Sequence, residues 1–417
     1  MNATSDAVTG FNVDRLFTAS RNFTDMSTWH AEAAQLRREG AVHKFSDKYY
    51  GDFWAVIQHD ALLEVSRQPE VFPNTKDAAF LGRGRRAYAE MQEDLPFEIK
   101  TLLSMDGEEH AKYRKVVVDW FKPSAIRRLQ IAVDGLVSEA MDELKAGGGE
   151  IDFATDIALP LPLRVIMEML GVPRADEPLM LKLTQEMFSA ADPELGSGSP
   201  FDALAEIAAY FTDLVADRQA NPTDDLTSAI ANATVNDQPI DMFAMMGLFA
   251  VLASAGHDTT SFAMSGGVEA FSRSPEQFQR LRDDPGLAEN AAHEVVRLTS
   301  PVRHFTRLTH REVEVAGHRF NPGDRILLSY PSANRDESVF ADPDRLDVGR
   351  PNAPHQVGWG HGPHYCLGAR LARMEITSVL AGLASTVESI EPAGQATWTA
   401  GHFVSGVKHA PIRCRLG

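Results

Sequence analysis

The sequence predicts a mainly helical protein with a few small β-sheets. Three segments carry apolar side chains at three- and four-residue spacing, which is the pattern of helices that bury one face: residues 155–173, 201–220 and 225–235. A stretch rich in glycine, proline and serine at 191–200 separates two helical segments, as turn-forming residues do. Strand-like segments are few and short, and most of them lie in the C-terminal third.

The expected strands are short runs of apolar and β-branched residues at 52–58, 313–320 and 325–330. The sequence NPGDR at 321–325 combines residues that favour tight turns. We therefore expect a hairpin turn at this point, joining the last two strands.

Composition narrows the class of protein. The chain has 417 residues, of which 44% are hydrophobic, enough for a large core. Its formal net charge of -18 argues against a nucleic-acid partner, which requires a cationic surface. The N-terminus shows no secretory signal, and the longest apolar-rich run, 243–255, is too short to span a bilayer. No repeat or linker marks a boundary, so we expect one cytoplasmic domain, 1–417, without membrane attachment.

The chain has only two cysteines, Cys366 and Cys414, which suits a reducing compartment. Cys366 directly precedes an amphipathic helical pattern at 367–384, and a helix N-terminus favours thiolate over thiol. Glycines at 358, 360, 362 and 368 leave the backbone around the sulfur free of side chains, as a loop against a large flat group requires.

Four interpretations of this loop compete. A zinc site of His361, His364 and Cys366 lacks an evident fourth ligand. A cysteine nucleophile lacks a recognisable partner in the sequence. A buried structural cysteine is the usual role of a single cysteine, but it does not explain the glycines. A thiolate ligand to haem iron explains both the sulfur and the glycines.

The segment WGHGPHYCLG resembles the haem-binding loop of the cytochrome P450 family, which reads aromatic-Gly-x-Gly-x-His-x-Cys-x-Gly. The matching residues are Gly360, Gly362, His364, Cys366 and Gly368. Trp359 stands where the family usually has phenylalanine, which affects the packing near the sulfur. The resemblance implies haem b (iron protoporphyrin IX) with Cys366 as the axial metal ligand.

The pair Glu294 and Arg297, in the sequence HEVVR, lies on one face of an expected helix. On its own, such a pair is usually a surface ion pair of little energetic weight. In the family, this Glu-x-x-Arg pair is buried and contacts an arginine in the meander before the cysteine loop. By resemblance Arg350 is that arginine, and Arg345 is the alternative.

The sequence ASAGHDTTS at 253–261 interrupts a long apolar segment. It could be a kinked core helix, but a buried Asp without a partner is costly, which favours a function. It resembles the family's oxygen-binding groove in the central helix. That implies a place for O2 beside Ala255 and catalytic roles for Asp258 and Thr259, whereas His257 and Thr260 could be structural.

His110 and Arg114 lie one helical turn apart in the sequence DGEEHAKYR. Taken alone, they would more often form a solvated charged face. By resemblance they bind a haem propionate, together with Arg307 and His364, and charge-assisted hydrogen bonds suit that role.

The resemblance covers most of the chain and implies the P450 fold, a single triangular prism-like domain with haem between the central helix and the helix after Cys366. The motifs are most similar to those of the bacterial subgroup of terpineol and aromatic-hydrocarbon hydroxylases. A monooxygenase of this subgroup uses O2, a ferredoxin and an NAD(P)H-dependent ferredoxin reductase, and we expect a monomer. The basic residues Lys112, Lys115, Arg370 and Arg373 are the candidate ferredoxin surface, with solvated helix positions as the alternative.

Segments that line the pocket in the family are mostly apolar here, which favours a small hydrophobic substrate, a monoterpenoid or an alkyl-aromatic. The candidate pocket residues are Phe80, Phe97, Ile99, Leu103, Val251, Ala255, Val302, Phe305, Phe403 and Val404. Residues 190–199 are a candidate lid connection. A peroxide-driven hydroxylase and a haem-based sensor are the alternative functions. The acid–threonine pair argues against the first, and no signalling domain is visible for the second.

Overall fold

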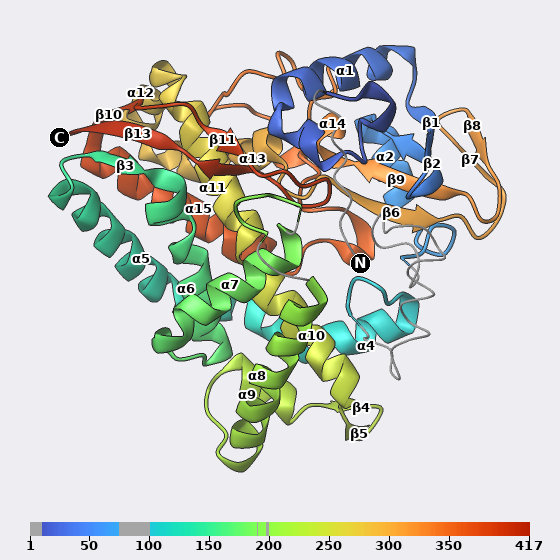
Figure 1. Cartoon of the computed structure of the whole chain (residues 1–417), viewed down its shortest axis with the longest axis horizontal. Helices are drawn as coiled ribbons and strands as arrows, with labels where there is room; N and C mark the ends of the chain where they lie inside the picture. Colours follow the sequence, from blue (N-terminus) through green and yellow to red (C-terminus); the bar gives the residue numbers. More distant parts are fainter. Residues whose placement is uncertain (1–10, 75–100, 190, 197–199) are drawn as a thin grey trace.

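The structure is a computed structural model, and it describes residues 11–74, 101–189, 191–196 and 200–417. Its helices are α1 (Met26–Glu39), α2 (His59–Ser66), α4 (Gly107–Val117), α5 (Pro123–Ala146), α6 (Pro160–Leu170), α7 (Glu177–Phe188), α8 (Pro200–Ala220), α9 (Leu226–Ala231), α10 (Met242–Ala255), α11 (Asp258–Ser272), α12 (Pro275–Asp283), α13 (Ala288–Thr299), α14 (Tyr330–Ala333) and α15 (Ala369–Thr386). The long helices fill most of a roughly triangular outline (Figure 1). The expectation of a mainly helical fold is confirmed.

The strands form small sheets. They are β1 (Val42–Asp47), β2 (Gly51–Val56), β3 (Glu150–Asp152), β4 (Thr234–Val235), β5 (Gln238–Pro239), β6 (His304–Leu308), β7 (Val313–Val315), β8 (His318–Phe320), β9 (Arg325–Ser329), β10 (Val387–Pro392), β11 (Thr397–Trp398), β12 (Val407–His409) and β13 (Pro411–Leu416). The largest sheet has the order β1-β2-β9-β6, and only its β2–β9 pair is parallel. A second sheet has the order β10-β13-β3, and the other strands form two-stranded hairpins.

The central strand β9 of the largest sheet is buried on both faces. Along β9, Ile326 and Leu328 join one apolar cluster with residues of α2, whereas Leu327 joins another with Trp29 of α1. Successive side chains of a strand point to opposite faces, so a central strand covered on both sides is apolar throughout. This pattern explains why the segment 325–330 is detectable as a strand from sequence.

Two expectations about local structure are wrong. The turn at NPGDR does not join a hairpin, because β8 ends before it and β9 pairs with β6 and β2 instead. The hairpin lies earlier, between β7 and β8, where Ala316 and Gly317 adopt positive φ angles of 48° and 76°. The helix expected at 225–235 ends at Ala231, and the chain continues into the short β4–β5 hairpin.

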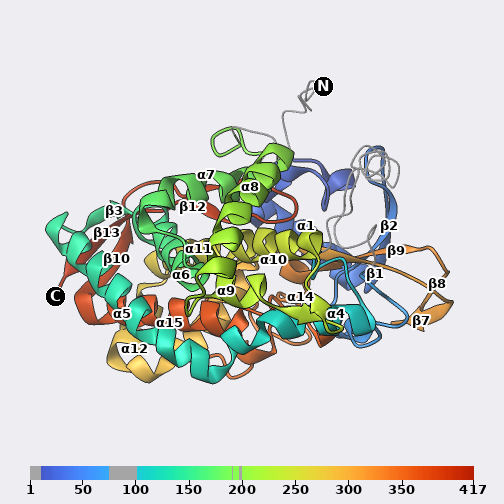
Figure 2. The same cartoon turned by 90° about the horizontal axis from the view of Figure 1, so that it is seen from below.

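The central helical segment is divided into α10 and α11, which Figure 2 shows running through the middle of the molecule. α10 packs against α7 and α8, whereas α11 packs against α13 and α15. α15 also packs against α5. Within the described part of the chain, no helix combines the length and hydropathy needed to cross a bilayer.

Candidate active site

A cavity lies between the α10–α11 segment and the loop that carries Cys366. The cavity and its opening together hold about 1530 Å³ of empty space. One wall comes from Val251, Ala255, Gly256, Thr259, Thr260 and Ala263. The facing wall comes from the Cys366 loop and the first turns of α15. The sulfur-bearing loop and the interrupted helix, 110 residues apart in sequence, therefore face each other across one space.

Cys366 faces the cavity from the end of the loop. Its backbone N–H donates to the Trp359 carbonyl at 2.8 Å, and α15 begins three residues later, after Gly368 as N-cap. Burial raises the pKa of the Cys366 thiol, although the N–H groups of Gly368 and Ala369 and the charge of Arg114 oppose this. The N–H groups at the helix terminus favour the thiolate, in the direction expected from the sequence, but burial has the larger, opposite effect. A cation bound at the sulfur would favour the thiolate.

The glycines of the loop have conformational reasons to be glycine. Gly360 and Gly362 adopt φ angles of 71° and 75°, a backbone conformation that residues with a side chain rarely adopt. A Cβ atom on Gly362 would also lie 2.5 Å from the Ser66 carbonyl oxygen. Gly362 does not line the cavity, so the protein's own packing, rather than a bound group, requires glycine there.

The four side chains predicted to bind haem carboxylates all lie on the cavity wall: His110, Arg114, Arg307 and His364. The rings of His110 and His364 lie 4.3 Å apart, and His364 Nε2 lies 3.2 Å from Asp106 Oδ1. Burial lowers the pKa of His110 to about 4, helped by the charges of His364 and Arg114. An anionic group placed among these side chains would attract their positive charges and thereby favour the protonated form of His110.

The donor set fits an iron porphyrin with two carboxylates. A thiol faces the cavity, the walls are mainly apolar, and the cationic and imidazole groups offer several hydrogen-bond donors to carboxylates. Zinc sites in proteins use at least three protein ligands, and the described residues hold no group of three or more histidine, cysteine and acidic side chains that could bind a metal.

The predicted catalytic pair, Asp258 and Thr259, begins α11 directly after the break from α10. Thr259 lines the cavity, and its hydroxyl donates to the Ala255 carbonyl at 2.8 Å. Asp258 is buried behind the wall, with Oδ1 3.2 Å from His257 Nδ1, and Oδ2 has no partner among the described residues. Burial raises the pKa of Asp258, opposed by the charge of His257.

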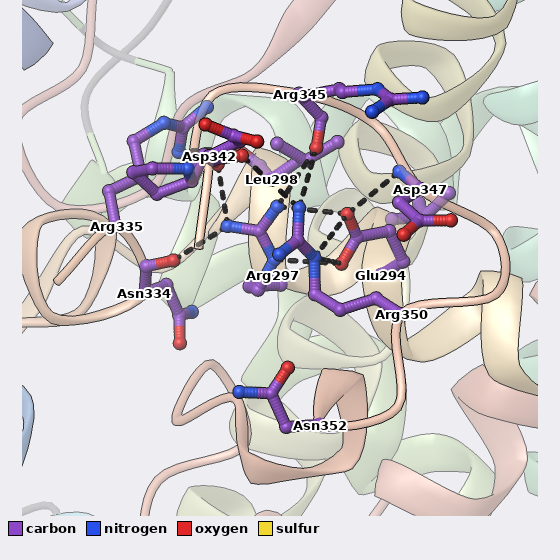
Figure 3. A network of polar contacts seen from close by, with 12 residues as sticks. Glu294, Arg297, Leu298, Asn334, Arg335, Asp342, Arg345, Asp347, Arg350 and Asn352 are labelled. Atoms are coloured by element: carbon purple, nitrogen blue, oxygen red, sulfur yellow. Dashed lines mark hydrogen bonds and ion pairs between the residues drawn. The ribbon is translucent and has the colours of Figure 1, made fainter. Parts of the chain in front are cut away.

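Glu294, Arg297 and Arg350 form a buried network beside the cavity (Figure 3). Glu294 Oε2 lies 2.7 Å from Arg297 Nε, and Oε1 lies 3.0 Å from Arg350 Nε. Arg345, the alternative from sequence, contributes only its carbonyl, 2.9 Å from Arg350 Nη2. The two guanidinium groups also donate to the carbonyls of Asn334, Pro343 and Ala341, which fixes the path of the chain before the Cys366 loop.

Comparison with known proteins decides the family. The family model "Cytochrome P450" matches residues 286–392. Cytochrome P450-terp of a Pseudomonas species is 37% identical over 393 residues, which are 91% of this chain and 91% of that protein. The chain belongs to the cytochrome P450 family. The P450 is also similar to linalool 8-monooxygenase of Pseudomonas putida, 33% identical over 92% of this chain and 95% of that one. The crystal structure of CYP108D1 from Novosphingobium aromaticivorans superimposes with a TM-score of 0.88 and 34% identity, covering 97% and 98% of the two chains.

The structure divides the predicted pocket residues of this P450 into three groups. Leu103, Val251, Ala255, Val302 and Phe305 line the cavity. Phe80, Phe97 and Ile99 lie outside the described residues. Phe403 and Val404 are not among the described residues that line the cavity. Val404 is buried in a bridge with Val302, and the Phe403 ring packs against the Phe305 ring at 5.4 Å, supporting the wall from behind.

Sequence reasoning missed several residues of the cavity wall, including Leu102, Phe121, Ile166, Tyr330 and Glu375. Most of them are apolar and indistinguishable from core residues in the sequence. Glu375 had a detectable signal, because it lies four residues after Leu371 and four before Val379, on the buried face of α15. In the structure Glu375 is buried, and Oε2 has no partner among the described residues.

Replacing Glu375 with glutamine is expected to make the P450 less sensitive to alkaline pH. Burial raises the pKa of Glu375 from 4.5 to about 8, so the folded state retains a proton that the unfolded chain releases. Between these two values the folded state binds more protons, and its stability therefore falls as pH rises. Near pH 8, we expect the variant to gain about 1–3 kcal/mol in unfolding free energy relative to wild type.

Urea unfolding at pH 5.5 and pH 8 measures this effect. The exposed Glu391→Gln variant is the matched control and should follow wild type at both pH values. An equal difference between Glu375→Gln and wild type at the two pH values would contradict the prediction.

Proposed function

We propose that this P450 is a monooxygenase that hydroxylates a small apolar molecule, a monoterpenoid or an alkyl-aromatic, with O2 and two electrons from a ferredoxin chain. The observation that supports it most directly is the cavity, which has the Cys366 thiol on one wall and the Thr259 hydroxyl on the α10–α11 wall. Relatives named cytochrome P450-terp and linalool 8-monooxygenase support the terpenoid class. We treat 1–417 as one domain that acts as a cytoplasmic monomer.

Haem b, when bound, supplies the redox chemistry that activates O2 and oxidises a C–H bond. In our proposal, the Cys366 sulfur would bind its iron, and His110, Arg114, Arg307 and His364 would hold its carboxylates. Gly368 and Trp359, which line the cavity on the wall that carries Cys366, would help to hold it. Trp359 differs from the usual phenylalanine, and we expect it to tune the potential of the bound cofactor.

The α10–α11 segment would handle protons in this mechanism. Ala255 and Gly256 leave room on the cavity wall for a small molecule. Thr259 would then exchange its hydrogen bond to the Ala255 carbonyl for one to a water in the cavity. Asp258, the residue before Thr259, would resupply the proton from behind the wall, as general acids held near a reaction centre do.

The substrate class rests on the apolar part of the wall. Val251, Ile166, Val302 and Phe305 offer no charged partner to a substrate, so binding energy would come from burying apolar surface. Titrating the purified protein with monoterpenoids and alkylbenzenes tests the proposal. A low- to high-spin shift with micromolar affinity and a hydroxylated product would support it. Neither shift nor product with either class would refute it.

Reversing the charges of Lys115 and Arg370 should slow reduction by the ferredoxin without changing substrate affinity. Both side chains are exposed, and Arg370 lies near the start of α15, beside the Cys366 loop. Arg373 is a weaker choice than the sequence suggested, because Glu289 lies 3.5 Å from it. Ferredoxins are usually acidic, so we expect Lys115→Glu with Arg370→Glu to lower the second-order reduction rate about tenfold at low salt.

Stopped-flow reduction at several ionic strengths measures that rate. Lys145→Glu, a charge reversal at the far end of α5, is the control. If reduction is equally fast in the double variant and the control, the ferredoxin does not dock at Lys115 and Arg370.

A further inference from the structure

The break between α10 and α11 contains a buried set of hydrogen bonds that the proposed mechanism does not yet use. His257 is completely buried and contacts three different elements. Its Nε2 lies 3.0 Å from the Leu159 carbonyl oxygen, just before α6. Its Nδ1 lies 3.0 Å from Thr184 Oγ1 of α7 and 3.2 Å from Asp258 Oδ1.

These contacts determine how many protons the set holds. A carbonyl only accepts, so His257 Nε2 must carry a proton toward Leu159. The Thr184 hydroxyl has a single hydrogen to donate. Its oxygen, Oγ1, lies 3.1 Å from the Leu181 carbonyl oxygen, which also only accepts. When Thr184 donates to Leu181, its oxygen can accept from His257 Nδ1. All contacts are then satisfied together only if both ring nitrogens carry protons and Asp258 is ionised.

The proton on His257 Nδ1 has an alternative acceptor, Asp258 Oδ1, at 3.2 Å. Moving it from His257 Nδ1 to Asp258 Oδ1 converts an imidazolium and a carboxylate into a neutral imidazole and a neutral acid. The net charge of the pair is zero in both forms, so a buried site can hold either one. Burial alone favours the neutral acid, since it raises the pKa of Asp258, whereas the hydrogen bond to Thr184 favours the imidazolium.

We propose that His257 is a positioning residue that stores a proton for Asp258, and that Thr184 of α7 determines which of the two holds it. The inference rests on the proposed function, because it gives the stored proton a use one residue from Thr259. While Thr184 contacts Nδ1, the proton stays on His257 and Asp258 remains ionised. When α7 moves and this contact is lost, the proton passes to Asp258, which can then donate it toward the cavity.

Infrared spectroscopy tests this assignment without turnover, since a protonated carboxyl group absorbs apart from a carboxylate. We compare wild type with Thr184→Val, each measured against the same protein carrying Asp258→Asn. The Asp258→Asn reference removes the background from Glu375 and other acids. We expect Thr184→Val to show a protonated carboxyl band that wild type shows weakly or not at all. The loss of one hydrogen bond should raise the ratio of neutral to ionised Asp258 about tenfold.

Two further variants make the result specific. Thr184→Ser retains the hydroxyl and should restore the wild-type spectrum. Thr227→Val removes another buried hydroxyl, which donates to the Leu170 carbonyl, and should leave the Asp258 band unchanged. A spectrum of Thr184→Val identical to wild type, or a band that survives Asp258→Asn, would overturn the proposal. Absence of hydroxylated product in wild type would instead refute the proposed function, so the two failures are distinguishable.

Discussion

Replacing Glu294 with alanine is expected to lower the unfolding free energy by about 3–5 kcal/mol. Glu294 and Arg297 are fully buried, and the Glu294 carboxylate faces the guanidinium groups of both Arg297 and Arg350. Removing it leaves these two buried cations without a carboxylate partner among the described residues, a far larger cost than losing an exposed ion pair. The Asp347 backbone N–H also loses its acceptor, Glu294 Oε1 at 3.0 Å.

The chain provides a matched control for this variant. Arg345 has an exposed side chain and joins the network only through its carbonyl, which Arg345→Ala retains. We expect that variant to stay within about 0.5 kcal/mol of wild type in chemical unfolding. A Glu294→Ala protein as stable as Arg345→Ala would show that the network does not stabilise the fold.

Replacing Thr259 with valine is expected to lower the yield of product per electron by about 10²-fold, the effect of removing a positioned proton donor. The valine has nearly the same shape, so the cavity wall is retained while the hydroxyl is lost. Because that hydroxyl now donates to the Ala255 carbonyl, removing it should change fold stability little. Measuring product against consumed NAD(P)H separates loss of coupling from loss of binding.

The Thr259→Ser variant retains the hydroxyl and should recover most of the yield. Substrate affinity should be similar in all three proteins, since the rest of the wall is unchanged. A Thr259→Val protein that couples electrons to product as well as wild type would exclude Thr259 from proton delivery.

The sequence predicted the parts of the site that depend on unusual residue types. Cys366, the glycines around it and the polar break at 256–260 stand out from apolar helical patterns, and the structure places Cys366 and Thr259 on one cavity. The helical class was also predictable, because spacing of apolar residues depends on local geometry. Strand pairing was not: β9 pairs with β2, more than 260 residues away, and nothing local to NPGDR indicates this.

The side-chain surroundings were also beyond the sequence. Asp258 and Thr259 are adjacent in the chain, yet only Thr259 reaches the cavity, because successive residues of a helix point in different directions. Phe403 and Val404 belong to the correct segment but support the wall rather than form it. The effect of burial on Cys366 outweighs that of the helix terminus, and judging that balance requires the packed structure.

The carbon monoxide difference spectrum of the reduced protein, recorded beside Cys366→Ala, tests the central claim most directly. We expect wild type to show the strongly red-shifted Soret band of a haem–thiolate protein and the variant to lose it. Absence of haem from the wild-type protein, or a Soret band at the position of imidazole-ligated haem, would contradict the assignment of Cys366 as the axial ligand.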